Sequence, residues 1–163
     1  MKKSIALLAL ISIAFVNAQA YKGKGDIKFQ VGATMQEHAT GIGTSIDYGL
    51  GENLSYGLAF SYLLNTTDAG GTPKFDDKFD AKLRFNANIG NVLKISEKFD
   101  VYPGLNLGLR NFGAHLGARY FFTNGFGLFT EAGIPLAKYN TNAIGYERFN
   151  NQFVFQIGAS FNL

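Results

Sequence analysis

Apolar and polar positions alternate strictly along the last part of the chain. Its two rows are Phe153, Phe155, Ile157, Ala159, Phe161 and Leu163 on one side, and Gln152, Val154, Gln156, Gly158, Ser160 and Asn162 on the other. A period of two places these rows on opposite faces of a β-strand. In a soluble protein, a long uncharged terminal strand would be an aggregation hazard unless it were fully paired and covered. Closure of a barrel in a membrane removes that hazard.

The same alternation recurs in seven earlier segments, so the pattern predicts eight strands. They cover residues 27–36, 42–50, 54–64, 79–89, 99–109, 114–122, 128–136 and 152–163. We expect the fourth strand to continue to Ile95, with a bulge near Gly90 and Asn91. Pro103 in the fifth strand requires a gap or bulge in the hydrogen-bond ladder, because proline has no N–H to donate.

Three short polar segments that join strands share a pattern, in which a large apolar residue follows the turn: 51–53, 96–98 and 123–125. Each keeps the apolar row on the same face across the hairpin, as a three-residue turn with a bulge does. The two strands of each hairpin therefore present one continuous apolar face. The other links are longer or more irregular and lie near residues 37–41, 65–78, 111–113 and 138–148.

The distribution of glycine indicates which face points outward. Eight strands leave an interior only just wide enough for side chains, and the bulky apolar residues share one row while Gly, Ser and Asn share the other. The apolar rows carry no charge between Ile27 and Leu163, as expected where a Lys or Arg facing lipid costs about 2–4 kcal/mol at mid-depth. The pattern therefore predicts a membrane barrel. An interfacial aromatic belt, or simple β preference, would account for tyrosines toward the strand ends: Tyr48, Tyr56, Tyr62 and Tyr120.

Residues 1–18 have the features of a cleavable secretory signal peptide. Lys2 and Lys3 precede an apolar run over residues 5–16, which is too short to span a membrane comfortably as an anchor helix, and small residues follow. Cleavage after Ala18 is favoured and cleavage after Ala20 is also compatible. The barrel domain would then cover residues 19–163.

Length and composition narrow the classes of protein. A chain of 163 residues accommodates one domain, and 20 Gly and 16 Phe against 3 Pro indicate turn-rich β structure. Without Lys2 and Lys3 there remain 13 basic and 12 acidic residues, a net charge of about +1. No basic cluster interleaves with aromatic residues, so we expect no nucleic-acid partner. The absence of cysteine excludes disulfides, thiolate metal sites and a lipidated cysteine, and His38 and His115 are too few for a convincing metal site.

Gln156, Gly158, Phe161 and Leu163 match the polar-x-Gly-x-x-apolar-x-apolar closing-strand signal of bacterial outer-membrane β-barrels. With the signal peptide, eight alternating segments and three similar turns, the chain resembles the small eight-stranded barrels of the OmpA and OmpX type, in a Bacteroidota version. The resemblance implies an all-β, antiparallel, up-and-down transmembrane barrel, exported by the Sec route. It implies periplasmic chaperones and the barrel-assembly machinery as partners during biogenesis, and a monomer in outer-membrane lipid. The three short turns would be periplasmic and the other links would face the outside.

Charged residues of the polar rows are predicted to face the interior in two rough layers. Nearer the short turns are Asp47, Lys94, Asp100, Arg119 and Glu131, and nearer the other links are Asp80, Lys82, Arg84, Arg110 and His115. Counting across residues 123–125 makes Arg119 and Glu131 direct or diagonal cross-strand neighbours, and so predicts an ion pair between them.

Counting across residues 96–98 places Lys94 opposite Asp100 and Arg84 opposite Arg110. The second of these pairs is like-charged. It would need Asp80, another carboxylate, water or an anion nearby.

Three functions compete for this arrangement. The interior charges could select ions in a narrow diffusion channel, or fill the lumen by pairing with each other, and the small bore favours filling. His115, Glu131 and a serine such as Ser45 or Ser61 have the residue types for acyl transfer, as in a lipid-modifying enzyme. Such a triad needs hydrogen-bond contact and access to lipid, whereas these residues are predicted to lie inside the barrel, so we expect no catalytic residue. We also expect no cofactor and no metal.

Transport of hydrophobic molecules, as in OmpW-like barrels, would need an apolar interior, and the polar rows argue against it.

Besides a role of the interior and catalysis, the third class of function is recognition of a partner at the cell surface. The longest predicted links carry residues suited to contacts with a partner: Asp68, Asp76, Asp77, Tyr139, Tyr146, Glu147 and Arg148. We therefore predict a structural or surface-interaction role with a charge-filled lumen.

Overall fold

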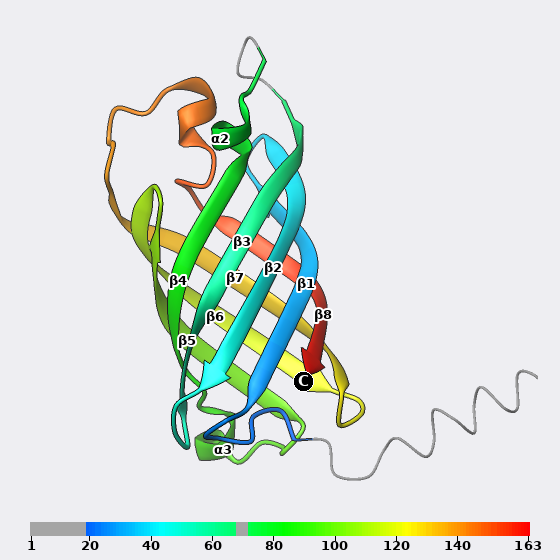
Figure 1. Ribbon diagram of the computed structural model, residues 1–163. Helices are drawn as coiled ribbons and strands as arrows, with labels where there is room; N and C mark the ends of the chain where they lie inside the picture. Colours follow the sequence, from blue (N-terminus) through cyan, green and yellow to red (C-terminus); the bar gives the residue numbers. More distant parts are fainter. Residues whose placement is uncertain (1–18, 68–71) are drawn as a thin grey trace, which may run out of the picture.

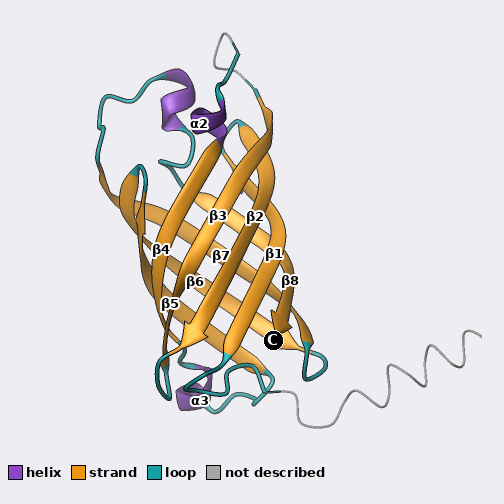
Figure 2. Ribbon diagram, in the orientation of Figure 1, coloured by secondary structure: helices purple, strands orange, loops and turns teal. Residues whose placement is uncertain are grey.

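The chain closes into a single cylinder of strands in the computed structural model, which describes residues 19–67 and 72–163 (Figures 1 and 2). Every strand pairs antiparallel with its sequence neighbours, and β1 pairs with β8. The strands are β1 (Ile27–Gln36), β2 (Ala39–Gly49), β3 (Leu54–Thr66), β4 (Phe79–Ala87), β5 (Phe99–Gly108), β6 (Asn111–Phe121), β7 (Phe126–Lys138) and β8 (Val154–Asn162). The predicted up-and-down eight-stranded antiparallel barrel is confirmed. The predicted signal peptide and Asp68 lie outside the described residues.

The links gather at two ends that differ in character (Figure 1). At one end, here called the loop end, lie α2 (Phe75–Lys78) and the short 3₁₀ helix η1 (Gly145–Arg148), in the β3–β4 and β7–β8 links. At the other, here called the turn end, lie α3 (Gly90–Leu93), the segment 19–26 that precedes β1, and the carboxyl terminus. Within the described residues, none of the helices is long and apolar enough to cross a membrane.

Two of the three predicted short turns have the expected geometry. Leu50 N–H donates to the carbonyl of Leu54 at 2.8 Å, and Phe122 N–H donates to that of Phe126 at 3.0 Å, so each hairpin is closed by three residues. At the loop end the strands pair further than predicted. β2 begins at Ala39 and β6 at Asn111, which leaves turns of only two residues, 37–38 and 109–110.

The predicted extension of the fourth strand to Ile95 is wrong. β4 ends at Ala87, and the chain then forms α3 and stops in the left-handed conformation at Lys94, with φ 53°. Gly90 is held against β5 at this point, because its N–H donates to Asp100 Oδ1 at 2.9 Å and a Cβ there would lie 2.5 Å from the carbonyl oxygen of Phe99. The β4–β5 ladder ends at the pair Asn86 and Gly104, so Pro103 lies just beyond it, where a missing N–H costs no ladder bond.

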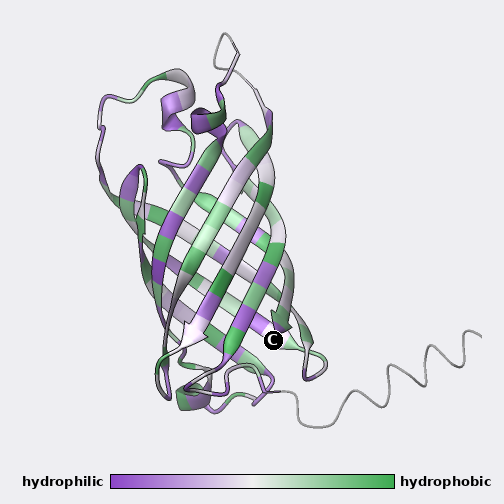
Figure 3. Cartoon of the chain, viewed as in Figure 1, coloured by the Kyte–Doolittle hydropathy of each residue, from purple (hydrophilic) through white to green (hydrophobic). Residues whose placement is uncertain are grey.

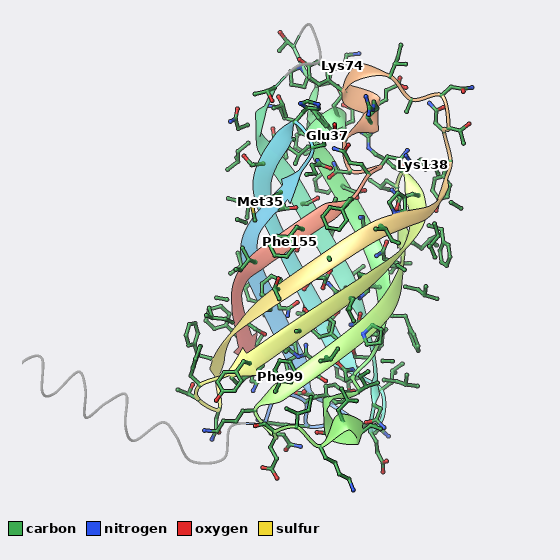
Figure 4. All side chains as sticks on the ribbon, turned by 180° about the vertical axis from the view of Figure 1, so that it is seen from behind. Met35, Glu37, Lys74, Phe99, Lys138 and Phe155 are labelled. Atoms are coloured by element: carbon green, nitrogen blue, oxygen red, sulfur yellow. The ribbon has the colours of Figure 1, made fainter. Side chains whose placement is uncertain are left out.

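The outer wall is apolar and the interior is polar, the reverse of a soluble barrel. Alternation of hydropathy is visible along the front strands in Figure 3, and Figure 4 shows side chains projecting outward at both edges of the cylinder. Exposed large side chains along the strands include Ile46, Leu58, Phe60, Leu83, Leu107, Leu116, Leu128, Ile134 and Ile157. Buried side chains are mostly polar or charged, among them Lys28, Gln30, Asp47, Asp80, Arg84, Asn86, Asp100 and Arg119. Burying such groups is tolerable only if they are paired with one another.

Aromatic rings form a belt around the turn end of the outer wall. A chain of ring contacts with centroids 5.3–6.2 Å apart runs through Phe29, Phe161, Phe126, Phe122 and Tyr120. Tyr48 and Tyr56 pack edge to face at 5.8 Å on β2 and β3. Aromatic girdles at such positions are typical of membrane–water interfaces.

Candidate functional site in the barrel interior

A stack of cationic and aromatic side chains occupies the barrel interior toward the turn end. The Tyr102 ring contacts both interior arginines, with its centroid 4.7 Å from Arg119 Cζ and 5.8 Å from Arg84 Cζ. The stack continues toward the turn end, where the Tyr21 ring lies 6.0 Å from Arg119 Cζ and 5.9 Å from Lys28 Nζ. We call these five residues the cation–aromatic column. Desolvated contacts of this kind contribute about 2 kcal/mol each.

Carboxylates neutralise the cations of the column. Arg84 Nη2 lies 2.6 Å from Glu131 Oε2, and its Nε lies 3.2 Å from Asp47 Oδ1. Arg119 Nη2 lies 2.7 Å from Asp100 Oδ2 and donates at the same distance to Asn88 Oδ1, while Lys28 pairs with Asp26. These ion pairs lie mostly buried inside the barrel, so they hold the charged side chains of the interior to one another.

Arg119 and Glu131 do not form the predicted ion pair. Arg119 lies opposite Phe129 and Glu131 opposite Gly117, so the two are only diagonal neighbours across β6 and β7. Arg119 instead pairs with Asp100, which is directly opposite it on β5. Glu131 reaches across the lumen to Arg84 on β4, because a narrow barrel brings the side chains of distant strands together.

Two other predicted interior charges lie elsewhere. Lys94 is exposed at the end of α3, so it does not face Asp100. The cross-strand partner of Arg84 is Asn106, not Arg110. Arg110 lies in the β5–β6 turn at the loop end, where it donates to the carbonyls of Asp76 and Glu147. The expected like-charged pair therefore does not form.

His115 is held by two asparagines of the interior. Its Nε2 lies 2.7 Å from Asn86 Oδ1 and its Nδ1 lies 3.1 Å from Asn106 Nδ2, an arrangement that fits a neutral ring with the proton on Nε2. The Arg84 guanidinium lies 3.3 Å from the same Nε2, and in this tautomer it contacts the ring without a hydrogen bond, because both nitrogens are donors. Within the described residues, no hydrogen bond joins His115 to a serine.

The two candidate serines are engaged elsewhere, since Ser45 donates to Gln30 and Ser61 donates to Asn150. The structure therefore does not bring the acyl-transfer residue types together. In the same part of the chain, no group of three or more His, Asp or Glu side chains is arranged to hold a metal.

Two glycines make room for the interior rings of Tyr102 and His115. A Cβ on Gly117 would lie 2.1 Å from the Tyr102 ring, and a Cβ on Gly104 would lie 2.4 Å from His115 Nε2. Each glycine is the direct cross-strand partner of the ring that covers it. The rings of Tyr102 and His115 therefore occupy the space that side chains at Gly117 and Gly104 would take.

A small polar cavity lies between the Arg84 layer and the loop end. It has a volume of about 40 Å³, and its lining includes Asp80, Lys82, Glu131, Asn150 and Gln156. Lys82 Nζ lies 3.5 Å from Asp80 Oδ2. Such a volume holds a few water molecules at most.

The β7–β8 link folds over this cavity. The carbonyl of Asn150 accepts from Asn111 Nδ2 at 2.8 Å, and its N–H donates to Gln36 Oε1 at 2.9 Å. Asn151 also accepts from Asn111. The cavity is thus covered on the loop side by backbone and amide groups.

The sequence interpretation missed three column residues, namely Tyr21, Tyr102 and Lys28, although Lys28 lies in the polar row of the first strand. Tyr102 is the one aromatic residue in the inward row of its strand, beside Asp100, Gly104, Asn106 and Gly108. This aromatic residue among small and polar ones could have indicated that Tyr102 fills the bore, since a ring that faces inward in a narrow barrel must occupy the lumen. Tyr21 precedes the first strand and carries no comparable pattern.

Comparisons with known proteins agree with this fold. The barrel is similar to a designed transmembrane β-barrel, with a TM-score of 0.59 and 12% identity over 87% of this chain and 98% of that one. It is equally similar to the N-terminal β-barrel domain of OprF from Pseudomonas aeruginosa, with a TM-score of 0.59 and 13% identity over 87% of this chain and 100% of that one. The expected likeness to outer-membrane barrels is confirmed at the level of the eight-stranded fold. No curated protein sequence matches the chain. A family model described as a family of unknown function, DUF6646, matches residues 11–163, and the chain belongs to that family.

Proposed function

We propose that this protein is an integral outer-membrane barrel with a closed interior, whose role is structural or lies in surface interactions of its loop end. One observation carries the closed interior. Arg84, Tyr102 and Arg119 occupy the lumen together, and they are 5%, 0% and 1% exposed. Side chains therefore fill the bore where a channel would need water.

The cost of opening supports this proposal. A water path along the lumen would have to displace Tyr102 from its contacts with both arginines, and separate Arg84 from Glu131 or Arg119 from Asp100. Each of these changes breaks a buried charge pair or a contact between a cation and a ring. Steady conduction through the resting barrel is not expected.

Planar-bilayer recording of the refolded protein tests the closed interior. We expect a silent bilayer from samples that migrate as a folded barrel when unboiled. The alternative is a narrow diffusion channel. It would replace this proposal if the bilayer showed discrete conductance steps whose size changed in Glu131→Ala but not in Glu52→Ala, the matched control at an exposed residue. A lipid-modifying activity is the third candidate, and unchanged membrane lipids after His115→Ala would dismiss it.

The membrane location rests on the apolar wall and the closing strand. We propose export by the Sec route with cleavage after Ala18, followed by insertion as a monomer by the barrel-assembly machinery, in an OmpA/OmpX-like protein of Bacteroidota type. The Phe161 ring packs on those of Phe29 and Phe126, and Leu163 N–H donates to the carbonyl of Ile27. Phe161→Asp combined with Leu163→Asp should abolish assembly in the outer membrane, as measured by fractionation. Normal insertion of that variant would dismiss the role of the closing strand.

The loop end supports a surface role because its links are held in place. Arg110 joins the two longest links through the carbonyls of Asp76 and Glu147, and Tyr139 and Asp77 lie nearby around a pocket of about 320 Å³. Replacing both links by short turns separates the two roles. If the shortened barrel complements the envelope defect of cells that lack the protein, the role is structural, and if it folds but fails to complement, the role lies in the links.

A further inference from the structure

Residues 19–26 fold back against the turn end of the barrel and do not extend away from it. They follow the blue trace beneath β1 and β2 in Figure 1. Ala20 N–H donates to the carbonyl of Glu97 at 2.7 Å, and Gly25 N–H donates to that of Gly49 at 2.8 Å. Gly49 N–H donates in turn to the carbonyl of Asp26 at 2.8 Å. The segment is thus bonded to the end of β2 and to the link that precedes β5.

Tyr21 is the anchor of this segment. Its side chain is 2% exposed, and its hydroxyl donates to the carbonyl of Leu54 at 2.6 Å, with Gly51 O also at 3.0 Å. Its ring completes the cation–aromatic column against Arg119 and Lys28. A tyrosine held by both its ring and its hydroxyl is a specific contact and not a loose terminus.

Gly49 shows that the barrel wall is shaped to receive the segment. A Cβ at this position would lie 2.0 Å from the carbonyl oxygen of Gly23 and 3.0 Å from Tyr21 Oη. Its nearest obstructing atoms all belong to the docked segment. Gly49 does not have a positive φ, so its backbone does not require glycine. The missing side chain at Gly49 therefore serves the docking of residues 19–26.

The segment covers charges that would otherwise meet water. Asp26, its last residue, pairs with Lys28, and the Tyr21 ring lies against Arg119 on the side of the turn end. Displacement of the segment would open the Arg119–Asp100 pair to solvent and remove one of the two rings that hold Arg119. Tyr102 would then be the next side chain that blocks the lumen from this end.

We propose that residues 19–26 form an intramolecular plug of the turn end, which keeps the interior network unreachable from that side and so contributes to the closed interior proposed above. This inference does not rest on a partner for the loop end. It predicts that loosening the plug changes access to the interior without changing the barrel wall.

Single-cysteine labelling tests the plug, because the chain has no cysteine of its own. Ser55 is buried, follows the Leu54 carbonyl that Tyr21 binds, and accepts hydrogen bonds from Asn86 and Asn88. In Ser55→Cys barrels, we expect a membrane-impermeant maleimide to react at least tenfold faster when Gly49→Ala is added. Gly51→Ala is the matched control, since a Cβ there meets nothing within 4 Å, and it should leave the rate unchanged.

A second cysteine position and a second way of displacing the segment distinguish release of the plug from general loosening of the barrel. Ser61→Cys lies toward the loop end, and its labelling rate should be the same with Gly49→Ala and without it. Tyr21→Ala should accelerate labelling of Ser55→Cys as Gly49→Ala does, and Tyr21→Phe, which keeps the ring, should do so less. Equal rates at Ser55→Cys in all folded variants, or equal acceleration at both cysteine positions, would overturn the proposal.

Hydrogen exchange in the unsubstituted protein gives a readout that does not depend on any variant folding. The amides of Ala20 and Gly25, which donate to Glu97 and Gly49, should be protected. Exchange of both at the rate of an unfolded chain would overturn the proposal, because the segment would then not be docked.

Discussion

The orientation of the barrel wall can be tested by one substitution placed at two depths. Leu116 lies in the middle of β6, opposite Pro103 and Ala132, and is 56% exposed. Leu109 lies in the β5–β6 turn beside the charged Arg110, and is 62% exposed. The two leucines therefore differ in depth along the barrel far more than in exposure.

The stability cost of an arginine at these two positions differs according to whether the wall faces lipid or water. An arginine facing lipid costs about 2–4 kcal/mol at the middle of a membrane barrel and about 0–1 kcal/mol near the interface. Leu116→Arg should therefore lower the free energy of unfolding by about 2–3 kcal/mol more than Leu109→Arg, which is about 30- to 150-fold in the folding equilibrium. If the wall faced water, both changes would be exposed surface substitutions with effects within about 0.5 kcal/mol.

Reversible unfolding by guanidinium in phospholipid vesicles measures this difference. The chain has no tryptophan, so the folded fraction is followed by the migration of unboiled samples and by circular dichroism. The shift in midpoint multiplied by the slope gives the change in free energy. Equal stability of Leu116→Arg and Leu109→Arg would refute the assignment of the apolar wall to lipid.

Three further perturbations probe the interior and the plug. Gly117→Ala should destabilise the barrel by about 1–3 kcal/mol, because the new methyl overlaps the Tyr102 ring, whereas Gly133→Ala, with no atom closer than 3.7 Å, should be close to neutral in the same unfolding assay. Arg119→Ala should cost about 3–5 kcal/mol by leaving a buried carboxylate without its partner. Burial raises the pKa of Tyr21 from 10.0 to about 12. Its stabilising contribution is therefore complete below pH 10 and lost as pH rises toward 12, so the free energy of unfolding should fall over that window, and Tyr21→Phe should make the fall smaller.

Much of the wall could be predicted from local pattern, because a period of two assigns faces without reference to any partner strand. The clear failure lies between Ala87 and Phe99. Apolar Leu93 and Ile95 continue the row of Ile89 there, but the chain turns into α3 where Gly90 contacts Asp100 on the next strand. A contact between strands overrode the local pattern.

The sequence alone determined the number of strands, the apolar outer wall, the polar interior and the closing strand, since each of these follows from alternation and from the narrowness of an eight-stranded bore. Only the tertiary structure decided which charges pair. Glu131 bonds Arg84 from the far side of the lumen, and Tyr21 enters from outside the strands. Hairpin counting relates a residue only to its sequence neighbours, whereas partners across a closed barrel depend on the stagger and tilt of all eight strands together.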